Sequence, residues 1–348
     1  MTPKVSVVLP VYNGERFVRR AIQSILEQTF ADFELLVLDD CSSDGSRDTV
    51  ATFRDPRIRL LVSPENRGIG PTLNQGLLES KGEYVARMDA DDVSFPRRLE
   101  VQAAFLDNHP DVDLCGARAL PFQQDAEIDF ARREAGRYES GSDLRMGLLF
   151  GPGVIHPTVM FRRGAFLDRG LCYKPLRYAQ DYELWTRAFF LLQPAVLPDT
   201  VLFYRVHRGN AAGRTPDTQE LVKGEIWAPL LQRLGAAATP QQLEVHSQLA
   251  DLRVTPDLRL ARGASEWTSI LLSLGRGKTW WDAHDYRRML SLKLLGVLQY
   301  ATRFGLRTLL IALRSELHPL RYASLRDQVK FLLKCLLRYH RESARSRG

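Results

Sequence analysis

The sequence has few cysteines and no long apolar run. Its four cysteines, spread over 348 residues, form no CxxC pair, which argues against a zinc site and for free thiols in a reducing compartment. No window of about 18 uncharged apolar residues is present, so we expect no membrane-spanning helix. The apolar run at residues 5–11 is short and precedes no small-residue cleavage pattern, so we also expect no signal peptide and a cytoplasmic protein.

Signature motifs of several enzyme classes are absent or incomplete. The sequence contains no GxSxG elbow and no HExxH pair, which leaves serine hydrolases and zinc proteases without support. A partial GxGxxG begins at Gly68, but Leu73 stands at its third glycine and the motif does not follow the first predicted strand, so a dinucleotide dehydrogenase is disfavoured. A P-loop is weaker still, because Leu272 occupies its first glycine position.

Positive charge is concentrated at the C-terminal end of the chain. The whole sequence carries a formal charge of +7, whereas residues 286–348 contain fourteen Lys and Arg against three Asp and Glu, a balance of +11. The remaining residues therefore carry −4. A basic tail on a slightly acidic body indicates that the tail, and not the body, has an anionic surface as its partner.

Predicted strands and helices alternate over the first 88 residues. Continuous apolar runs rich in β-branched residues predict strands buried on both faces, and apolar residues at helical spacing predict helices that cover them. The expected strands are residues 4–10, 33–38, 58–62 and 84–88, and the expected helices are residues 15–28, 46–53 and 70–78. This alternation with short connections predicts a doubly wound, mostly parallel α/β sheet.

The pattern continues less regularly and then changes. We expect a helix at 95–108, a strand at 114–119, a charged loop at 121–140, a strand at 156–161, a helix at 181–192 and an extended segment at 196–206. After residue 209 the sequence reads as helices separated by Gly and Pro. We therefore predict a catalytic domain at 1–212 and a helical extension at 213–348, basic and amphipathic from about residue 286.

Three carboxylates follow the fourth predicted strand. Asp89, Asp91 and Asp92 lie where ligands collect in open α/β sheets, at the carboxyl ends of the strands. Their oxygen atoms suit a hard divalent cation, which could bridge to the phosphates of a nucleotide. The alternative is that these residues only end the strand and cap the next helix, which Pro96 predicts to begin nearby.

Five short motifs stand in order near the ends of predicted strands. They are VSVVLPVYN at 5–13, FELLVLDD at 33–40, SSDGS at 42–46, NRG at 66–68 and MDADD at 88–92. Together they resemble the family 2 glycosyltransferases of the GT-A fold, over about residues 4–210. HPTVM at 156–160, QDYELW at 180–185 and YRVH at 204–207 resemble acceptor-side motifs of the same family.

The resemblance implies an activity and a donor site. Family members transfer a sugar from a nucleotide-diphosphate sugar, usually with inversion, to an acceptor hydroxyl, and bind Mn²⁺ or Mg²⁺. A UDP-sugar is the expected donor here, with Tyr12 packed on the base and Asp40 accepting a hydrogen bond from its edge. The residues expected to bind the donor are Pro10, Tyr12, Glu15, Asp40, Asn66, Gly68, Asp89 and Asp91.

The same resemblance implies a metal site. Asp89 and Asp91 match the DxD pair, and Asp92 would share the metal. A cation is needed because it stabilises the negative charge that grows on the nucleoside diphosphate leaving group. His207 matches a position that completes the metal shell, although a loop histidine bonded to the backbone explains it equally well.

Asp181 is the expected catalytic base. It matches the Asp of the family's Glu-Asp pair and opens a predicted helix, whose positive end should keep it ionised; the alternative is a plain helix cap. This chain has Gln180 before it, and loss of that carboxylate would alter acceptor contacts or the charge at the metal. His156, Gln180 and Trp185 are expected on the acceptor side, although Trp185 could equally be a core residue.

The basic tail lies outside the resemblance. Within residues 286–315, an arc of roughly 80° at helical spacing holds Lys293, Arg303, Arg307 and Arg314, with Leu294, Leu298, Leu306 and Leu309 on the far side. A second stripe contains Arg326, Lys330, Lys334 and Arg338, opposite Leu332 and Leu336. Such helices bind anionic membrane surfaces or pack against the body or a second subunit. Nucleic acid is not expected, because the aromatic residues form no stacking platform.

The sequence therefore predicts a metal-dependent, inverting hexosyltransferase of surface polysaccharide or glycolipid assembly, with a glycan or lipid-linked acceptor. It would be cytoplasmic and held at the inner face of the cell membrane by residues 286–348. A catalytically silent nucleotide-binding scaffold is the alternative, disfavoured because Asp40, Asp89, Asp91 and Asp181 are all present. A nucleotidyltransferase would carry a glycine-rich basic loop after the first strand, where this chain has VYNGE.

Overall fold

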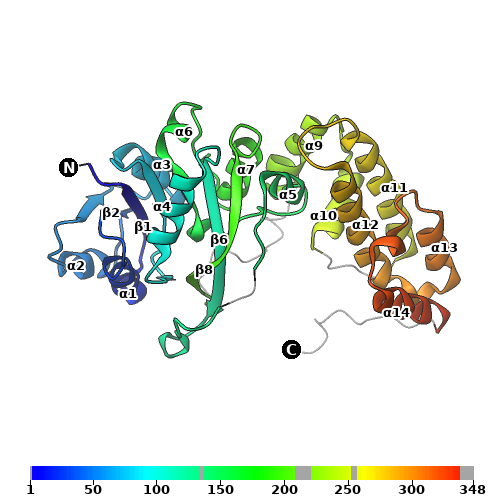
Figure 1. Ribbon diagram of the computed structural model, residues 1–348, viewed down its shortest axis with the longest axis horizontal. Helices are drawn as coiled ribbons and strands as arrows, with labels where there is room; N and C mark the ends of the chain where they lie inside the picture. The colour runs from blue at the N-terminus through cyan, green and yellow to red at the C-terminus, as the bar shows by residue number, and fades with distance from the viewer. Residues whose placement is uncertain (1, 134–135, 208–220, 252–256, 338–348) are drawn as a thin grey trace. The chain divides into compact units, whose positions relative to one another are not determined.

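The computed structural model describes residues 2–133, 136–207, 221–251 and 257–337 (Figure 1). The chain folds as two compact units, one formed by Met1–Leu144 and Pro152–Thr218 and the other by Arg145–Gly151 and Gln219–Gly348. The boundary predicted near residue 212 lies outside the described residues. The short segment Arg145–Gly151 joins the second unit, although it precedes much of the first unit in sequence.

An eight-stranded sheet organises the first unit, in the order β3-β2-β1-β4-β7-β6-β8-β5 (Figure 1). The strands are β1 (Val5–Val11), β2 (Phe33–Asp39), β3 (Ile58–Val62), β4 (Tyr84–Arg87), β5 (Val93–Ser94), β6 (Leu114–Phe122), β7 (Met160–Arg162) and β8 (Pro194–Arg205). Strands β3, β2, β1 and β4 are parallel, β7 is antiparallel to β4 and β6, and β5 is antiparallel to β8. The four parallel strands therefore end at one edge of the sheet.

Helices cover both faces of this sheet. They are α1 (Glu15–Leu26), α2 (Ser46–Ala51), α3 (Ile69–Glu79), α4 (Arg98–Asn108), α6 (Arg163–Leu167) and α7 (Gln180–Ala188), while α5 (Gly141–Gly147) crosses the boundary between the units. Val5, Val7 and Leu9 of β1 share a core with the apolar faces of α1 and α4. The opposite face approaches α3 so closely that a Cβ on Gly76 would lie 2.5 Å from Val8 Cγ1. The predicted two-sided α/β architecture is confirmed.

Several predicted bounds were wrong. The strand expected at 156–161 starts as a 3₁₀ turn, η2 (His156–Thr158), because Pro157 has no N–H to donate to a neighbouring strand. Only Met160–Arg162 pairs in the sheet. The helix expected at 181–192 ends at Ala188, and the charged loop at 121–140 contains a short 3₁₀ turn, η1 (Asp125–Glu127).

The described part of the second unit is helical. It contains the π-helical segment η3 (Val222–Trp227), then α9 (Ala228–Leu234), α10 (Pro240–Asp251), α11 (Leu258–Gly275), α12 (Ala283–Tyr300), η4 (Thr302–Phe304), α13 (Leu306–Arg314), η5 (Pro319–Tyr322) and α14 (Leu325–Leu336). Within the ranges that the structure describes, no helix combines the length and the apolarity needed to cross a membrane.

The basic stretch at 286–315 is two helices and not one. Helix α12 ends at Tyr300, and the chain turns through Gly305, whose φ of 61° suits glycine, before α13 begins. Because of this turn, the side chains of α13 do not continue the faces of α12. Leu294 and Leu298 are consequently buried, whereas Leu306 is 63% exposed, so the predicted single face of leucines is wrong here.

A buried histidine links three parts of the second unit. His246 of α10 lies with its Nε2 2.5 Å from the carbonyl oxygen of Leu149, and its Nδ1 accepts a hydrogen bond from Trp267 Nε1 of α11 at 3.1 Å. Because Nδ1 is an acceptor, Nε2 carries the proton and the ring is neutral. Burial lowers the pKa of His246 to about 4.

We expect acid to weaken this unit through His246. In the unfolded chain its pKa returns to about 6.5, so the unfolded state binds the proton first as the pH falls. The linked stability is complete above pH 6.5 and is lost between pH 6.5 and about 4, by up to about 3 kcal/mol. Urea unfolding between pH 7.5 and 5, followed by tryptophan fluorescence, measures this loss. His246→Gln should be less stable at pH 7.5 and less dependent on pH, and equal pH slopes would contradict the linkage. His284→Gln, at an exposed position, is the control.

Candidate active site

The site lies where the parallel strands end. Residue Val8 of β1 is in register with Arg87 of β4, and Val11 of β1 is in register with Asp39 of β2. Tyr12 and Asp40 therefore follow directly after the ends of β1 and β2, and Asp89 is the second residue after the end of the adjacent β4. Residues from distant parts of the sequence meet at this edge because the strands are parallel.

Three residues predicted to bind the donor lie together beyond β2. Asp40 is 4% exposed; its Oδ1 accepts a hydrogen bond from the Arg67 backbone N–H at 3.0 Å and its Oδ2 from the Gly68 N–H at 2.8 Å. Asn66 Nδ2 donates to the Asp40 carbonyl oxygen at 3.3 Å. Each carboxylate oxygen has a second lone pair, so the carboxylate can still accept a hydrogen bond from a ligand.

The other predicted donor residues surround the end of β1. Tyr12 is 56% exposed, which leaves its ring available for stacking. Pro10 is partly buried within the strand. The Glu15 side chain accepts a hydrogen bond from Gly45 N–H at 3.0 Å, and Glu15 N–H donates to Asp44 Oδ2 at 3.0 Å, so Glu15 fastens the loop after β2.

An acidic cluster follows β4. Carboxylate oxygens of Asp89, Asp91 and Asp92 lie within 4.8 Å of one another. The guanidinium of Arg87, buried in β4, forms an ion pair with Asp89. Asp92 Oδ1 accepts a hydrogen bond from the Arg205 backbone N–H at 2.8 Å, while its buried Oδ2 has no partner among the described residues.

The end of β8 is fastened to this cluster. Arg205 Nε donates to the Asp91 carbonyl oxygen at 2.7 Å, and His207 Nε2 lies 2.9 Å from Asp91 Oδ2. The Arg205 guanidinium also lies over the rings of Phe17 and Phe122, at 4.6 and 4.3 Å from their centroids. These contacts bring His207 to the acidic cluster from 116 residues away along the chain.

The cluster contains more negative than positive charge. Burial raises the pKa of Asp89 although Arg87 opposes the shift, and the charge of Asp91 raises it further. Burial, then Asp89 and Asp91, raise the pKa of Asp92 well above its ordinary value. A surplus of carboxylates, hard oxygen donors and one unpartnered buried oxygen together fit a divalent cation such as Mg²⁺ or Mn²⁺.

Asp181 lies close to this cluster. It is partly buried in the first turn of α7, after Gln180, and its charge contributes to raising the pKa of Asp89. Burial raises the pKa of Asp181 itself, although the backbone N–H of Tyr182 opposes the shift. Burial thus outweighs the backbone N–H groups at the helix end in setting the direction of this shift. A raised pKa makes Asp181 a better proton acceptor than an ordinary carboxylate.

Two of the predicted acceptor residues, His156 and Trp185, lie in one group of aromatic rings, and the third, Gln180, begins α7. His156 Nε2 lies 2.9 Å from the Tyr173 hydroxyl, and burial, followed by the charge of Arg87, lowers the pKa of His156 well below its ordinary value. The neutral ring contacts Trp185 edge to face at 6.0 Å, and Trp185 stacks on Phe189 at 5.5 Å. Trp185 is fully buried, so it supports His156 and has no surface of its own.

The sequence analysis assigned no role to four residues at the site. Arg87 had a signal, as the single charged residue within an apolar strand. Asp39 and Arg205 stand within the motifs FELLVLDD and YRVH, and Asp39 has one buried oxygen without a partner in the described part of the chain. Tyr173 carried no signal, because its role depends on tertiary contact with His156.

Comparisons with known proteins agree with this geometry. The family model described as glycosyl transferase family 2 matches residues 6–170. The putative glycosyltransferase EpsE of Bacillus subtilis is 34% identical over 200 residues, which cover 54% of this chain and 67% of EpsE. The amylovoran biosynthesis glycosyltransferase AmsE of Erwinia amylovora is 31% identical over 205 residues, 58% of this chain and 75% of AmsE.

Solved structures share the fold at low sequence identity. A crystal structure of S. aureus TarS residues 1–349 in complex with UDP-GlcNAc has a TM-score of 0.56 at 19% identity, and the match covers 93% of this chain and 92% of that 1–349 chain. The mannosyltransferase PcManGT of Pyrobaculum calidifontis, in complex with GDP-Man and Mn²⁺, has a TM-score of 0.52 at 20% identity and covers 97% and 87%.

The ion pair between buried Arg87 and partly buried Asp89 generates a stability prediction. Arg87→Met removes the cation beside Asp89 and should destabilise the first unit by about 1–3 kcal/mol, because the Asp89 carboxylate keeps some access to solvent. Asp89→Asn should also destabilise, and the double variant should lose less than the sum of the two single losses because the residues are coupled. Urea unfolding monitored by circular dichroism measures all three. Arg97→Met, in an exposed pair with Glu100, should cost at most about 1 kcal/mol, and additive losses at Arg87 and Asp89 would refute the coupling.

Proposed function

Because this chain belongs to the family 2 glycosyltransferases, we propose that its first unit transfers a sugar, with inversion, from a nucleoside diphosphate to an acceptor hydroxyl. The predicted GT-A fold is confirmed by the likeness to TarS. The observation that carries the proposed mechanism is the acidic cluster at the end of β4, with Asp40 and Asp181 at the same edge of the sheet. A catalytically silent scaffold would have no need for this concentration of buried carboxylates.

We assign the metal site to Asp89, Asp91 and Asp92, with His207 as a further ligand or as the group that orients Asp91. Their oxygen and nitrogen atoms match the preferences of Mn²⁺ and Mg²⁺. When bound, the cation supplies charge stabilisation for the diphosphate leaving group. The buried guanidinium of Arg87 holds Asp89 in place through their ion pair.

The donor site proposed here lies between β1 and the loop after β3. The exposed ring of Tyr12 would stack on the base, and the carboxylate of Asp40, held by two backbone N–H groups, would accept a hydrogen bond from its edge. TarS binds UDP-GlcNAc and PcManGT binds GDP-Man in the same fold, so the fold accommodates both nucleotides. We propose a UDP-sugar, in agreement with the TarS complex.

Asp181 is the proposed base. It would accept the proton of the acceptor hydroxyl as that oxygen attacks the anomeric carbon, and its raised pKa favours this transfer. His156, neutral and bonded to Tyr173, and Gln180 would bind the acceptor. The role of AmsE in amylovoran biosynthesis supports a glycan or lipid-linked acceptor in polysaccharide or glycolipid assembly, and the basic residues at 286–348 support a cytoplasmic enzyme at a membrane surface.

Substitutions separate the proposed metal ligand from the proposed base. Asp181→Asn removes only the proton acceptor, so kcat should fall about 10²–10⁴-fold while metal-dependent binding of the nucleotide is kept. Asp91→Asn should lose both transfer and that binding. Release of the nucleoside diphosphate measures transfer, and isothermal titration calorimetry measures binding. Asp111→Asn, at an exposed position, is the control. Near-full transfer by both Asp181→Asn and Asp91→Asn would contradict the assignment of Asp181 as the base and Asp91 as a metal ligand.

A nucleotide panel tests the donor class and the metal together. UDP, GDP, dTDP and ADP are each added with Mn²⁺ or with EDTA, and the unfolding temperature is measured. A ligand at one hundred times its Kd stabilises the native state by about 2.7 kcal/mol, so UDP with Mn²⁺ should raise the unfolding temperature and EDTA should abolish the shift. A shift with GDP alone would replace the UDP assignment, and no shift with any nucleotide would favour the silent scaffold.

A further inference from the structure

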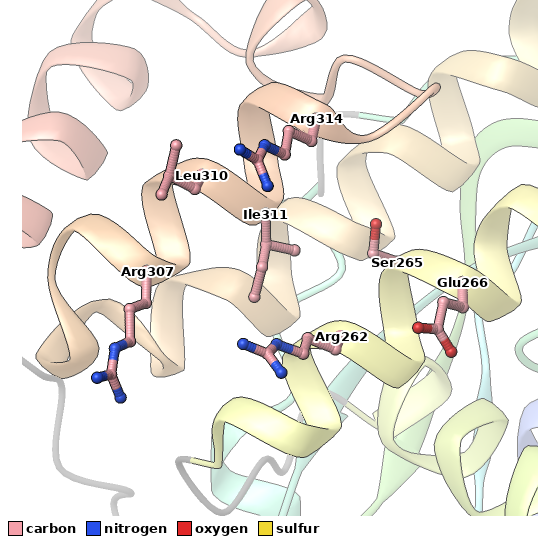
Figure 2. Close-up of a pocket in the computed structure, with 7 residues that line it drawn as sticks. All are labelled: Arg262, Ser265, Glu266, Arg307, Leu310, Ile311 and Arg314. Carbon is pink, nitrogen blue, oxygen red and sulfur yellow. The ribbon is translucent and has the colours of Figure 1, made fainter.

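A cationic cavity lies in the second unit, between α11 and α13. It has a volume of about 330 Å³ and is lined by Arg262, Ser265, Glu266, Arg307, Leu310, Ile311 and Arg314. Figure 2 shows Arg262 extending from α11 and Arg307 and Arg314 from α13, with Ile311 between them. The lining contains three guanidinium groups and one carboxylate, and none of the three guanidinium groups has a hydrogen-bond or ion-pair partner among the residues that the structure describes.

An exposed leucine stripe borders this cavity on α13. Leu306, Leu310 and Leu313, at i, i+4 and i+7, are 63%, 46% and 57% exposed, whereas Thr308 and Ala312 on the opposite side of the helix are buried. Leu310 belongs both to the stripe and to the cavity wall. Apolar side chains and cations are thus adjacent on one helix.

Helix α14, which packs against α13, has the same character. It buries only Phe331 and Cys335, and its exposed apolar side chains are Leu325, Val329, Leu332, Leu333 and Leu336. Arg326 and Lys330 are exposed beside this face. Of the basic stripe predicted from the sequence, Arg338 lies outside the described residues.

The positive charge beside the exposed leucines of α13 and α14 favours an anionic bilayer over a second copy of the chain as the partner of this surface. Soluble proteins rarely expose a large apolar patch without a partner. A second copy of the chain would place the same basic residues, from a segment of charge +11, against one another, which is unfavourable. An anionic bilayer satisfies both components, because leucines enter the boundary between headgroups and acyl chains while cations meet the lipid phosphates.

We propose that the surface formed by α13 and α14 docks on an anionic membrane, with one lipid headgroup phosphate held between Arg262, Arg307 and Arg314. The inference deepens the proposed function, because docking would bring the enzyme to a lipid-linked acceptor. It assigns the headgroup to a specific cavity and the membrane contact to specific leucines. Docking itself needs neither a donor nor catalysis.

Vesicle flotation of the full chain tests the proposal. Wild type should float with vesicles of phosphatidylcholine and phosphatidylglycerol, bind phosphatidylcholine alone far more weakly, and be released by salt. Arg262→Gln/Arg307→Gln/Arg314→Gln should weaken binding to the anionic vesicles by about tenfold or more. The control Arg54→Gln/Arg132→Gln/Arg169→Gln removes the same charge at exposed positions of the first unit and should bind nearly as wild type. Equal losses in the two triple variants would overturn the headgroup site.

The leucine stripe is tested separately. Leu310→Ser/Leu313→Ser should weaken flotation while keeping the circular dichroism spectrum and the molecular mass of wild type. A fall in mass from dimer to monomer, with flotation unchanged, would overturn the proposal in favour of a second copy. Repeating flotation with Asp181→Asn separates the two proposals: an inactive protein that still floats supports docking, and an active wild type that does not float overturns docking alone.

Discussion

Negative charge is concentrated at the end of β4, beside the buried guanidinium groups of Arg87, Arg98 and Arg205. Arg87 can occupy a buried strand position only because Asp89 pairs with it, and Asp92 remains buried with one oxygen unpartnered in the described structure. The arrangement costs folding free energy that an apolar strand end would not cost. Such a site is stable because the surrounding sheet is well packed, and it is prepared for a cation before one binds. The placement of the proposed metal, donor and base residues follows from this concentration of charge.

The turn after β4 is held from two directions. Met88 N–H continues the ladder to β1 by donating to the Val8 carbonyl oxygen at 3.0 Å, while Arg205 bonds Asp91 and Asp92 from the end of β8. Strand β8 therefore has two functions, since it pairs in the sheet and its end orients the acidic residues. Because these bonds join segments far apart in sequence, the geometry of the site forms only when the whole unit has folded.

Local features of the site could be predicted from the sequence, and long-range ones could not. The strands expected at 33–38 and 84–88 were found because each is a continuous apolar run that ends in carboxylates. The contacts of His156 with Tyr173 and of Arg205 with Asp91 depend on register between distant segments, which one sequence does not reveal. The raised pKa of Asp181 could not be predicted for a related reason: the helix end is visible in the sequence, but the burial that outweighs it comes from tertiary packing. The break at Gly305 was missed because the leucine period continues through it in the sequence.

Helix α14 contains a buried cysteine whose reactivity reports local opening of the helix. Its buried side chains include Cys335, a thiol whose pKa burial raises to about 11, and only the thiolate reacts readily with alkylating reagents. The thiol becomes reactive when the helix lifts from its neighbours, so the rate of alkylation counts those openings. The alkylation rate of Cys335 therefore measures the local stability of α14, the helix that bears the exposed leucines Leu325, Leu332, Leu333 and Leu336.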